Sequence, residues 1–346
     1  MPYLNNEEVR SQTRELWRTC FGDPEPFLDL YFTRKYTPAS NVCIIHERQV
    51  VAALQAFLYP MSFYGTVVRV GYLSGVATHP DHRGKGLASR IIDEAHRRLA
   101  KAGALMSFVI PAGEDLFGFY ERHGGYQTAV YRAEVDVTDS LDDVPPQFEV
   151  EEPEEEAQEI YTCYRNIRRR TDLALCHDRA SFFTAVAAWR QEGHVFCTVR
   201  RGGQLAGLCF ARRRDEGQCE VAEALARTDE ALDAMIHYAR RRLGTVRATM
   251  RVGASGNLPG AQPYAMARVL DAPRFLRLVQ QAQPGLTLDV GIGGDWVLPA
   301  NNAFYHLEGG RLSLTGQMPP TLTTPGGLAR MFLAGQPVQL KLMMDE

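Results

Sequence analysis

The sequence predicts an α/β (α+β) fold in which two mixed-sheet domains follow one another and a small α+β domain ends the chain. Amphipathic helical stretches alternate with apolar stretches of strand character, and the order of helices, strand meander and helix occurs twice in the 346 residues. A proline- and glutamate-rich segment near residue 140 separates the two occurrences. The predicted domains are residues 1–140, 141–265 and 266–346.

The first domain is expected to begin with two helices. Asn5 or Asn6 is a suitable cap for a helix that starts at Glu7 and ends at about Cys20. A second helix, with several aromatic residues, is expected from Pro26 to about Lys35. The remaining elements are strands at residues 41–47, 50–59, 67–78, 104–110 and 126–135, and helices from residue 87 and over residues 115–122.

The most informative stretch of the first domain is the turn between the strand that ends near Thr78 and the helix that begins at Leu87. Its sequence is His-Pro-Asp-His-Arg-Gly-Lys-Gly. A glycine-rich turn that opens a helix leaves several backbone N–H groups without helical acceptors and pointing at one place. Such a turn is typical of an anion site, and the anion that it most often holds is a pyrophosphate.

Three pyrophosphate patterns were compared with this turn. The P-loop pattern ends in Gly-Lys-Ser/Thr and fails because Gly86 is followed by Leu87. The dinucleotide pattern fails because Ser89 stands at the position of its third glycine. Arg83, Gly86 and Ala88 satisfy Arg-x-x-Gly-x-Ala, which resembles the acetyl-CoA motif of the GNAT acetyltransferases. An ordinary strand-to-helix turn with incidental glycines is the alternative.

The GNAT resemblance implies a site for acetyl-CoA as co-substrate. In that family two central parallel strands splay apart where the thioester enters, and the edge of the first strand pairs with the pantetheine arm. The residues that the resemblance assigns to the donor are Val76, Ala77, Thr78, Arg83, Gly84, Lys85, Gly86, Leu87, Ala88 and Ser89. Tyr120, in Phe-Tyr-Glu-Arg, corresponds to the tyrosine that protonates the departing thiolate; the alternative for Tyr120 is a core aromatic with a bonded hydroxyl.

The second domain is expected to repeat the first without its donor site. Helices near residues 157–168 and 180–191 precede strands at 194–200, 204–212 and 220–226 and a helix over 228–243, but no Arg-x-x-Gly-x-Gly/Ala follows the third strand. Residues 267–279 resemble the stretch that opens the last domain of the Eis-like (enhanced intracellular survival) acetyltransferases. That resemblance implies an active GNAT domain, a degenerate one and a sterol-carrier-protein-like domain. Shorter pieces agree: strands at 286–290 and 303–307 and a helix over 328–335.

The general base is the weakest part of the match. Many GNAT enzymes deprotonate the acceptor amine with a glutamate on the strand before the pyrophosphate loop, yet residues 70–76 carry no carboxylate. Eis-like members use the carboxylate of their own C-terminus, which points to Glu346; a loosely held acidic tail is the alternative. His79, His82 and His123 are weaker candidates.

Composition and charge restrict the classes of partner and cofactor that the chain is expected to bind. A net charge of −3 without a long basic tract argues against nucleic acid, and no apolar run reaches the ~20 residues of a membrane span. Seven scattered cysteines form no Cys-x-x-Cys pair, so neither a metal site nor a disulfide framework is expected, and a reducing cytoplasm suits the chain. Relatives assemble as hexamers or smaller oligomers, so the resemblance allows a homo-oligomer.

The function predicted from these features is acetyl-CoA-dependent N-acetylation of a primary amine by direct attack in a ternary complex. The acceptor is left open between an aminoglycoside-like polyamine, a small amine and a protein lysine. Asp29, Glu114 and Glu346 are candidates to line an acidic acceptor cavity. The aromatic residues of the second helix either form one wall of that cavity or belong to the core. The alternative function is a non-catalytic acyl-CoA- or lipid-binding protein built on the same domains.

Overall fold

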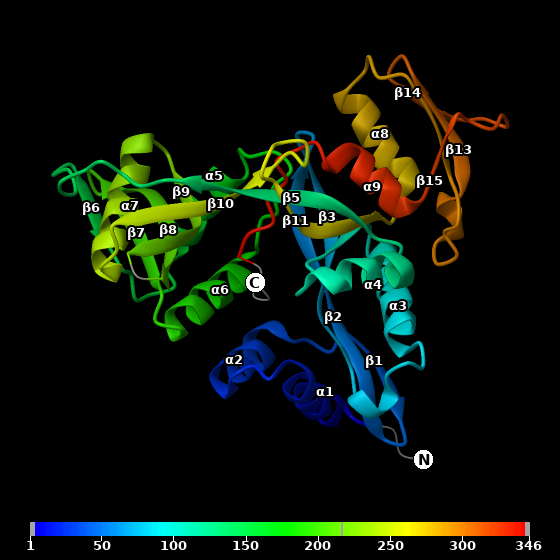
Figure 1. The fold of residues 1–346 in the computed structure, drawn as a ribbon, viewed down its shortest axis with the longest axis horizontal. Helices are drawn as coiled ribbons and strands as arrows, with labels where there is room; N and C mark the ends of the chain where they lie inside the picture. The colour runs from blue at the N-terminus through cyan, green and yellow to red at the C-terminus, as the bar shows by residue number, and fades with distance from the viewer. Residues whose placement is uncertain (1–3, 216, 343–346) are drawn as a thin grey trace.

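A computed structural model describes residues 4–215 and 217–342 of the chain (Figure 1). Within these residues the strands form two sheets, one large and one small. The large sheet has the order β1-β2-β3-β4-β11-β5-β10-β9-β8-β7-β6, and the small one β14-β13-β12-β15. The mixed α/β class predicted from the sequence is confirmed.

The first half of the large sheet follows the predicted order closely. Its elements are α1 (Asn6–Phe21), α2 (Glu25–Leu30), β1 (Asn41–His46), β2 (Gln49–Phe63), β3 (Thr66–Thr78), α3 (Leu87–Lys101), β4 (Ala104–Val109), α4 (Glu114–Gly124) and β5 (Gln127–Asp136). Asn5 caps α1 in a reciprocal capping box with Glu8. The second predicted helix is only partly right, because after Leu30 it continues as a π-helical turn over Tyr31–Lys35.

The second half repeats this arrangement, with α7 on one face of its strands and α5 and α6 on the other. Its elements are β6 (Phe148–Glu151), α5 (Gln158–Arg168), α6 (Arg179–Gln191), β7 (Val195–Arg201), β8 (Gln204–Asp215), β9 (Gln218–Ala226), α7 (Asp229–Leu243) and β10 (Arg247–Ala254). The sequence interpretation missed β6, which lies in the segment expected to be a linker, and β10. We call residues 4–140 unit 1 and residues 141–254 unit 2.

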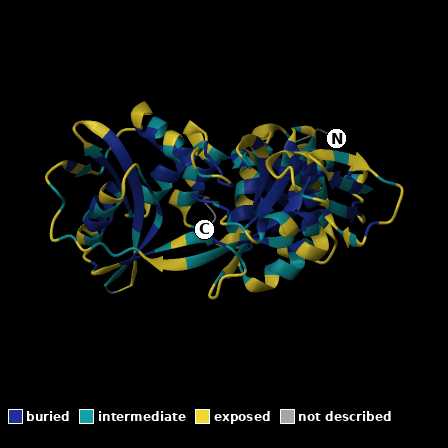
Figure 2. Cartoon of the chain, turned by 90° about the horizontal axis from the view of Figure 1, so that it is seen from above, coloured by how far each residue is buried: buried dark blue, intermediate teal, exposed yellow. Residues whose placement is uncertain are grey.

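Two pairings join the units into one sheet. β10 pairs antiparallel with β5, and β11 (Gln262–Val269), which was also missed, lies between β4 and β5 and is antiparallel to both. The predicted boundary between residues 265 and 266 therefore falls inside a strand of the large sheet. Figure 2 shows buried residues gathered in two lobes, with the described C-terminal end between them.

The last part of the chain forms the small sheet and two helices. α8 (Ala272–Ala282), β12 (Leu288–Ile292), β13 (Ala303–Glu308), β14 (Arg311–Leu314), β15 (Thr321–Thr323) and α9 (Pro325–Leu333) follow β11. Strands β14 and β15 were not predicted. Apolar residues of α8 and α9 belong to the same core cluster as β3 and β4, and the buried Arg268–Asp295 ion pair adds a polar link. None of the described helices is long and apolar enough to cross a membrane.

Candidate active site

The site begins with a fork between the two parallel strands at the centre of unit 1. β3 and β4 pair up to Leu73 and Val109, where β4 ends, while β3 continues for five residues to Thr78. On its other edge β3 stays paired with β2 as far as Thr78. The main chain of residues 74–78 therefore offers one strand edge to whatever enters the fork.

A β-bulge at Gly75 shapes this edge. The pairs Ala53–Ala77 and Gln55–Ser74 leave one extra residue on β3, and Gly75 adopts a φ of 59°, in the left-handed region. A Cβ at Gly75 would collide with the indole ring of Trp17 on α1. An isolated glycine in an apolar strand is typical of a bulge, so the sequence contained this signal, but the interpretation did not use it.

The loop from His79 to Gly86 leads from the fork to α3. Pro80–His82 form a 3₁₀ turn, in which the backbone N–H of Asp81 donates to His79 Nδ1 at 3.3 Å. Arg83 is held back over the loop because its Nε donates to the carbonyl oxygen of Thr78 at 3.2 Å. These bonds fix the loop before the glycines that open the helix.

The N-terminus of α3 is left open to a ligand. Gly84 and Gly86 have φ values of 73° and 71°, and no atom lies within 4 Å of a Cβ placed on either. Gly86 is the N-cap, and no side chain accepts a bond from the first turn of the helix. The free N–H groups and the positive end of the helix dipole therefore face the cavity described next.

A cavity of about 610 Å³ lies over this helix terminus and the open edge of β3. Its lining includes nine of the ten residues predicted to hold the donor, the exception being Lys85, whose Nζ donates to the Asp81 carbonyl at 3.1 Å. Tyr120 lines the same cavity. The full lining is Cys20, Phe21, Val76, Ala77, Thr78, His82, Arg83, Gly84, Gly86, Leu87, Ala88, Ser89, Leu116, Phe119, Tyr120 and His123.

A fork, an uncapped helix behind a glycine turn and a cavity that joins them are what a pantetheine arm and a pyrophosphate need. Residues 3–129 match the family model described as acetyltransferase (GNAT) domain. This part of the chain is similar to GNAT acetyltransferase domains.

Solved structures extend the likeness in fold beyond that domain. A conserved protein from Enterococcus faecalis described as a probable N-acyltransferase has a TM-score of 0.73 at 17% identity, covering 97% of this chain and 89% of its own. Eis1 from Mycobacterium abscessus has a TM-score of 0.72 at 12% identity, with 96% and 89% covered. A GCN5-related N-acetyltransferase from Anabaena variabilis has a TM-score of 0.73 at 15% identity, and the match covers 95% of this chain and 88% of its own. No curated protein matches the sequence.

On α4 of unit 1, Tyr120 is a buried polar residue of the cavity. Only 7% of its surface is exposed, and its ring lies edge-on to that of Tyr126 at 6.2 Å between centroids. One turn further, His123 Nδ1 lies 3.0 Å from the Ser89 hydroxyl of α3 and so ties the two helices together at the cavity wall. The cavity thus combines a buried phenol with the open helix terminus.

Several contributors to the cavity were missed from the sequence. Cys20 and Phe21 come from the end of α1, and Cys20 Sγ lies 3.5 Å from the carbonyl oxygen of Thr78. Leu116 lies on the same helix as Tyr120, four residues earlier. The helical spacing on α4 was available as a signal for Leu116, whereas the approach of α1 depends on tertiary packing.

His82 is the titratable ring closest to the glycine turn in sequence. Its pKa lies below the ordinary histidine value, first because of desolvation and then because of the positive charge of Lys85 and the neighbouring rings of His46 and His79. The ring centroids of His46 and His79 lie 5.5 and 5.9 Å from that of His82. A bound phosphate would oppose these effects and favour the protonated ring.

No carboxylate is among the described residues that line the cavity. Asp29 instead forms an ion pair with Arg14 at 2.6 Å on the surface of the first two helices. Glu346 lies outside the described residues. Of the predicted aromatic wall, Tyr31 belongs to a buried cluster and bonds the Ser74 hydroxyl at 2.9 Å, while Phe27 lines a second cavity between the units.

Proposed function

We propose that the protein is an acetyl-CoA-dependent N-acetyltransferase of the Eis-like type that acts on a primary amine. The observation that carries this proposal is the joining of the β3–β4 fork to the uncapped, glycine-opened N-terminus of α3 within one cavity. The fork offers a strand edge to the pantetheine amides, and the helix terminus offers N–H donors to the pyrophosphate.

The donor would be held mainly by backbone groups. The N–H groups of residues 84–89 would bind the pyrophosphate, with the guanidinium of Arg83 and the ammonium of Lys85 adding positive charge at the rim. The edge of Val76, Ala77 and Thr78 would align the pantetheine so that the thioester lies in the fork. Such alignment lowers the barrier because the thioester is held ready for attack.

The reaction would proceed in a ternary complex without an enzyme-bound acetyl group. The lone pair of the neutral amine attacks the thioester carbonyl carbon and forms the C–N bond, and the C–S bond breaks as the tetrahedral intermediate collapses. Tyr120 would donate its phenolic proton to the departing sulfur, giving the CoA thiol. The proton that the amine loses goes to a base.

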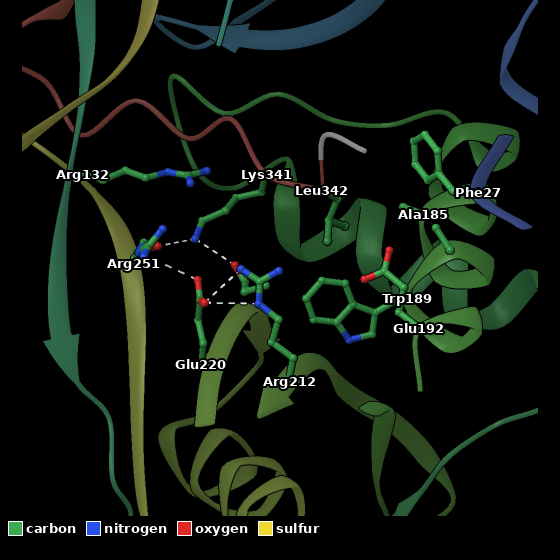
Figure 3. Close-up of a pocket in the computed structure, with 12 residues that line it drawn as sticks. Phe27, Arg132, Ala185, Trp189, Glu192, Arg212, Glu220, Arg251, Lys341 and Leu342 are labelled. Carbon is green, nitrogen blue, oxygen red and sulfur yellow. Dashed lines mark hydrogen bonds and ion pairs between the residues drawn. The ribbon is translucent and has the colours of Figure 1, made fainter. Parts of the chain in front are cut away.

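We assign the base to the carboxylates at the C-terminus, with Glu346 as the candidate side chain. The support is the position of Leu342, the last described residue. Leu342 and Phe27 both line the small pocket between the units that is drawn in Figure 3. The described part of the donor cavity provides no acid that would compete for this role.

A thiol-release assay with acetyl-CoA and a panel of primary amines tests the function. We expect amine-dependent release of CoA thiol and a mass gain of one acetyl group on the amine. If CoA binds but no amine in the panel stimulates thiol release, the protein is a CoA-binding protein and the proposed activity is wrong.

A further inference from the structure

Unit 2 contains a fork of the same kind as unit 1, but a lysine occupies it. β9 and β10 pair in parallel up to Val221 and Met250, and β9 continues to Ala226. Lys341, from the segment after α9, donates its ammonium to the carbonyl oxygens of Ala222 (2.9 Å) and Arg251, the first residues beyond the last pair. The side chain is 4% exposed. A cation thus lies where unit 1 has its open strand edge.

Arginines from three strands surround this lysine (Figure 3). Glu220 on β9 accepts a bond from Arg212 of β8 at 3.0 Å, and its other oxygen lies 3.8 Å from Arg251 Nε of β10. Arg132 of β5 donates to the Leu340 carbonyl oxygen at 2.8 Å. In the pocket of Figure 3 two carboxylates, Glu220 and Glu192, therefore lie with three guanidinium groups and one ammonium group.

Arg132, Arg212, Arg251 and Glu220 also line a larger cavity between the units of about 830 Å³, which we call the basic cavity. Lys341 lies in the smaller pocket of Figure 3, which shares these four residues with the basic cavity. The far wall of the basic cavity is Ile110–Ala112 and Phe117, just beyond the end of β4 and therefore beside the fork of unit 1. The charged lining residues are Arg132, Arg212, Arg214, Arg251, Glu134 and Glu220. Glu134 is engaged by Arg214 in an ion pair. The four arginines outnumber the two carboxylates, so positive charge is in excess in the basic cavity.

Two of the four guanidinium groups of the basic cavity lie near aromatic rings. Arg132 lies over the ring of Tyr264 at 3.1 Å, and Arg212 lies 5.6 Å from the ring of Trp189. Stacking fixes the plane of a guanidinium group, which lowers the entropy lost when it binds a planar anion. An excess of positive charge in a cavity between the units attracts an anion to it.

We infer that the basic cavity binds a carboxylate or phosphate group of the acceptor, whose amine then lies at the fork of unit 1. This inference rests on the proposed function and narrows it: the acceptor is an anionic amine rather than a polycation. The acidic acceptor cavity expected from the sequence is replaced by a basic one. Polyamines would be repelled by the same arginines.

Matched amines test the charge preference. Thiol release is measured with 4-aminobutanoate, 6-aminohexanoate and 8-aminooctanoate against the alkylamines of equal carbon number, and with the corresponding aminoalkylphosphonates, which separate carboxylate from phosphate recognition. We expect kcat/KM for the best anionic amine to exceed that of its alkylamine by about tenfold or more, the usual worth of a charge-assisted hydrogen bond.

Arg251→Gln tests the cavity itself, because Glu220 keeps its bond to Arg212 in this variant. The matched control is Arg213→Gln, on the same strand as Arg212, since Arg213 donates to the Leu243 carbonyl oxygen and does not line the basic cavity. Arg251→Gln should lose the preference for the anionic amine about tenfold, and Arg213→Gln should keep it. Arg132→Gln is the second variant, for use if Arg251→Gln does not fold.

Calorimetry of 6-aminohexanoate binding in the presence of CoA tests anion binding in the basic cavity independently of acetyl transfer. Binding that Arg251→Gln weakens and Arg213→Gln does not supports the cavity even if no amine releases thiol, a result that would overturn the proposed function alone. Equal rates for the two amine series, with wild-type preference in Arg251→Gln, overturn the inference while the activity stands. Binding seen only in a chain that ends at Leu342 also overturns it, since the chain's own acidic end is then the occupant.

Discussion

The two units differ most where their third strand meets the following helix. In unit 1, eight residues separate β3 from α3, two of them left-handed glycines, and no side chain caps the helix. In unit 2 only Arg227 and Thr228 separate β9 from α7. Thr228 caps that helix by accepting from the N–H of Ala231 at 3.3 Å, and Asp229 and Glu230 follow in its first turn.

The difference predicts that unit 1 keeps an anion site and that unit 2 has lost it. A helix N-terminus binds a phosphate only while its N–H groups are free, and a threonine cap with two acids satisfies them from within the chain. Lys341 completes the change by bonding the carbonyl oxygens inside the fork of unit 2. We therefore expect one donor site per chain, in unit 1.

The largest expected effect comes from closing the glycine turn of unit 1. Gly86→Val places a β-branched residue at a φ of 71° and covers the N–H groups of the turn. We expect the affinity for CoA to fall by about 100-fold or more, the loss of two or more charge-assisted hydrogen bonds, as measured by calorimetry. Gly203→Val is the control in unit 2, where φ is 77° and the surroundings are equally open; equal losses in both variants would mean that strain alone is responsible.

The second effect tests the phenol in the cavity of unit 1. Tyr120→Phe should lower kcat by about 100-fold, the lower end of the usual contribution of a general acid, and leave CoA affinity unchanged. Tyr126→Phe is the matched control, because the hydroxyl of Tyr126 bonds Ser107 at 2.7 Å and His96 at 2.9 Å instead of lining the cavity. It should lower stability but not kcat. Unchanged turnover in Tyr120→Phe removes the tyrosine from the mechanism.

The third concerns the acid that the described cavity of unit 1 does not supply. A chain that ends at Leu342 moves the terminal carboxylate by four residues and lacks the side chains of Asp345 and Glu346. If the terminal carboxylate or Glu346 accepts the amine proton, kcat at neutral pH should fall on the order of 100-fold and recover as the pH approaches the amine's own pKa. Asp345→Asn is the control, because it keeps Glu346 and the terminal carboxylate and should leave kcat unchanged. A wild-type pH–rate profile in the shortened chain contradicts the assignment.

The fourth effect is a pH dependence of CoA affinity that comes from His82, beside the glycine turn of unit 1. The pKa of His82 is lowered, so the ring is neutral at pH 7.5, and a bound pyrophosphate raises that pKa. Binding then takes up a proton, and CoA affinity should increase as the pH falls from 7.5 to 5.5. His82→Asn should reduce this increase by a few-fold at most, since the ring is near solvent. The comparison is with wild type because His46 and His79 are present in both proteins; identical pH profiles would exclude His82.

The smallest effect tests the closed helix of unit 2. Thr228→Ala removes the cap of α7 and should lower the free energy of unfolding by about 1 kcal/mol, seen in a denaturant titration. CoA affinity should not change. Weaker CoA binding in this variant would mean that the two units share the donor, against the comparison drawn above.

How far the sequence predicted this molecule depended on whether a feature is local. The glycine turn, the motif around Tyr120 and the amphipathic helices are short-range patterns, and the sequence predicted each of them. β6 and β11 were missed for a long-range reason. β6 is an edge strand in a charged segment with only Phe148 fully buried, and β11 is defined by β4 and β5, strands more than 100 residues away.

The basic cavity was beyond sequence reasoning for the same reason. Its arginines come from β5, β8 and β10, each followed or preceded by ordinary surface residues, and nothing in their spacing shows that they face one space. The resemblance to acetyltransferases of aminoglycosides favoured an acidic cavity. Charge at a site built from distant strands follows from the sheet order, which the sequence alone did not provide.

A calorimetric titration of the full chain with acetyl-CoA tests the central claim most directly, because it counts donor sites. The difference between the two strand-to-helix turns predicts one equivalent bound per chain, with an affinity lower by about 100-fold or more in Gly86→Val. Two equivalents per chain, or one equivalent bound with wild-type affinity in Gly86→Val, would contradict the assignment of the donor to unit 1.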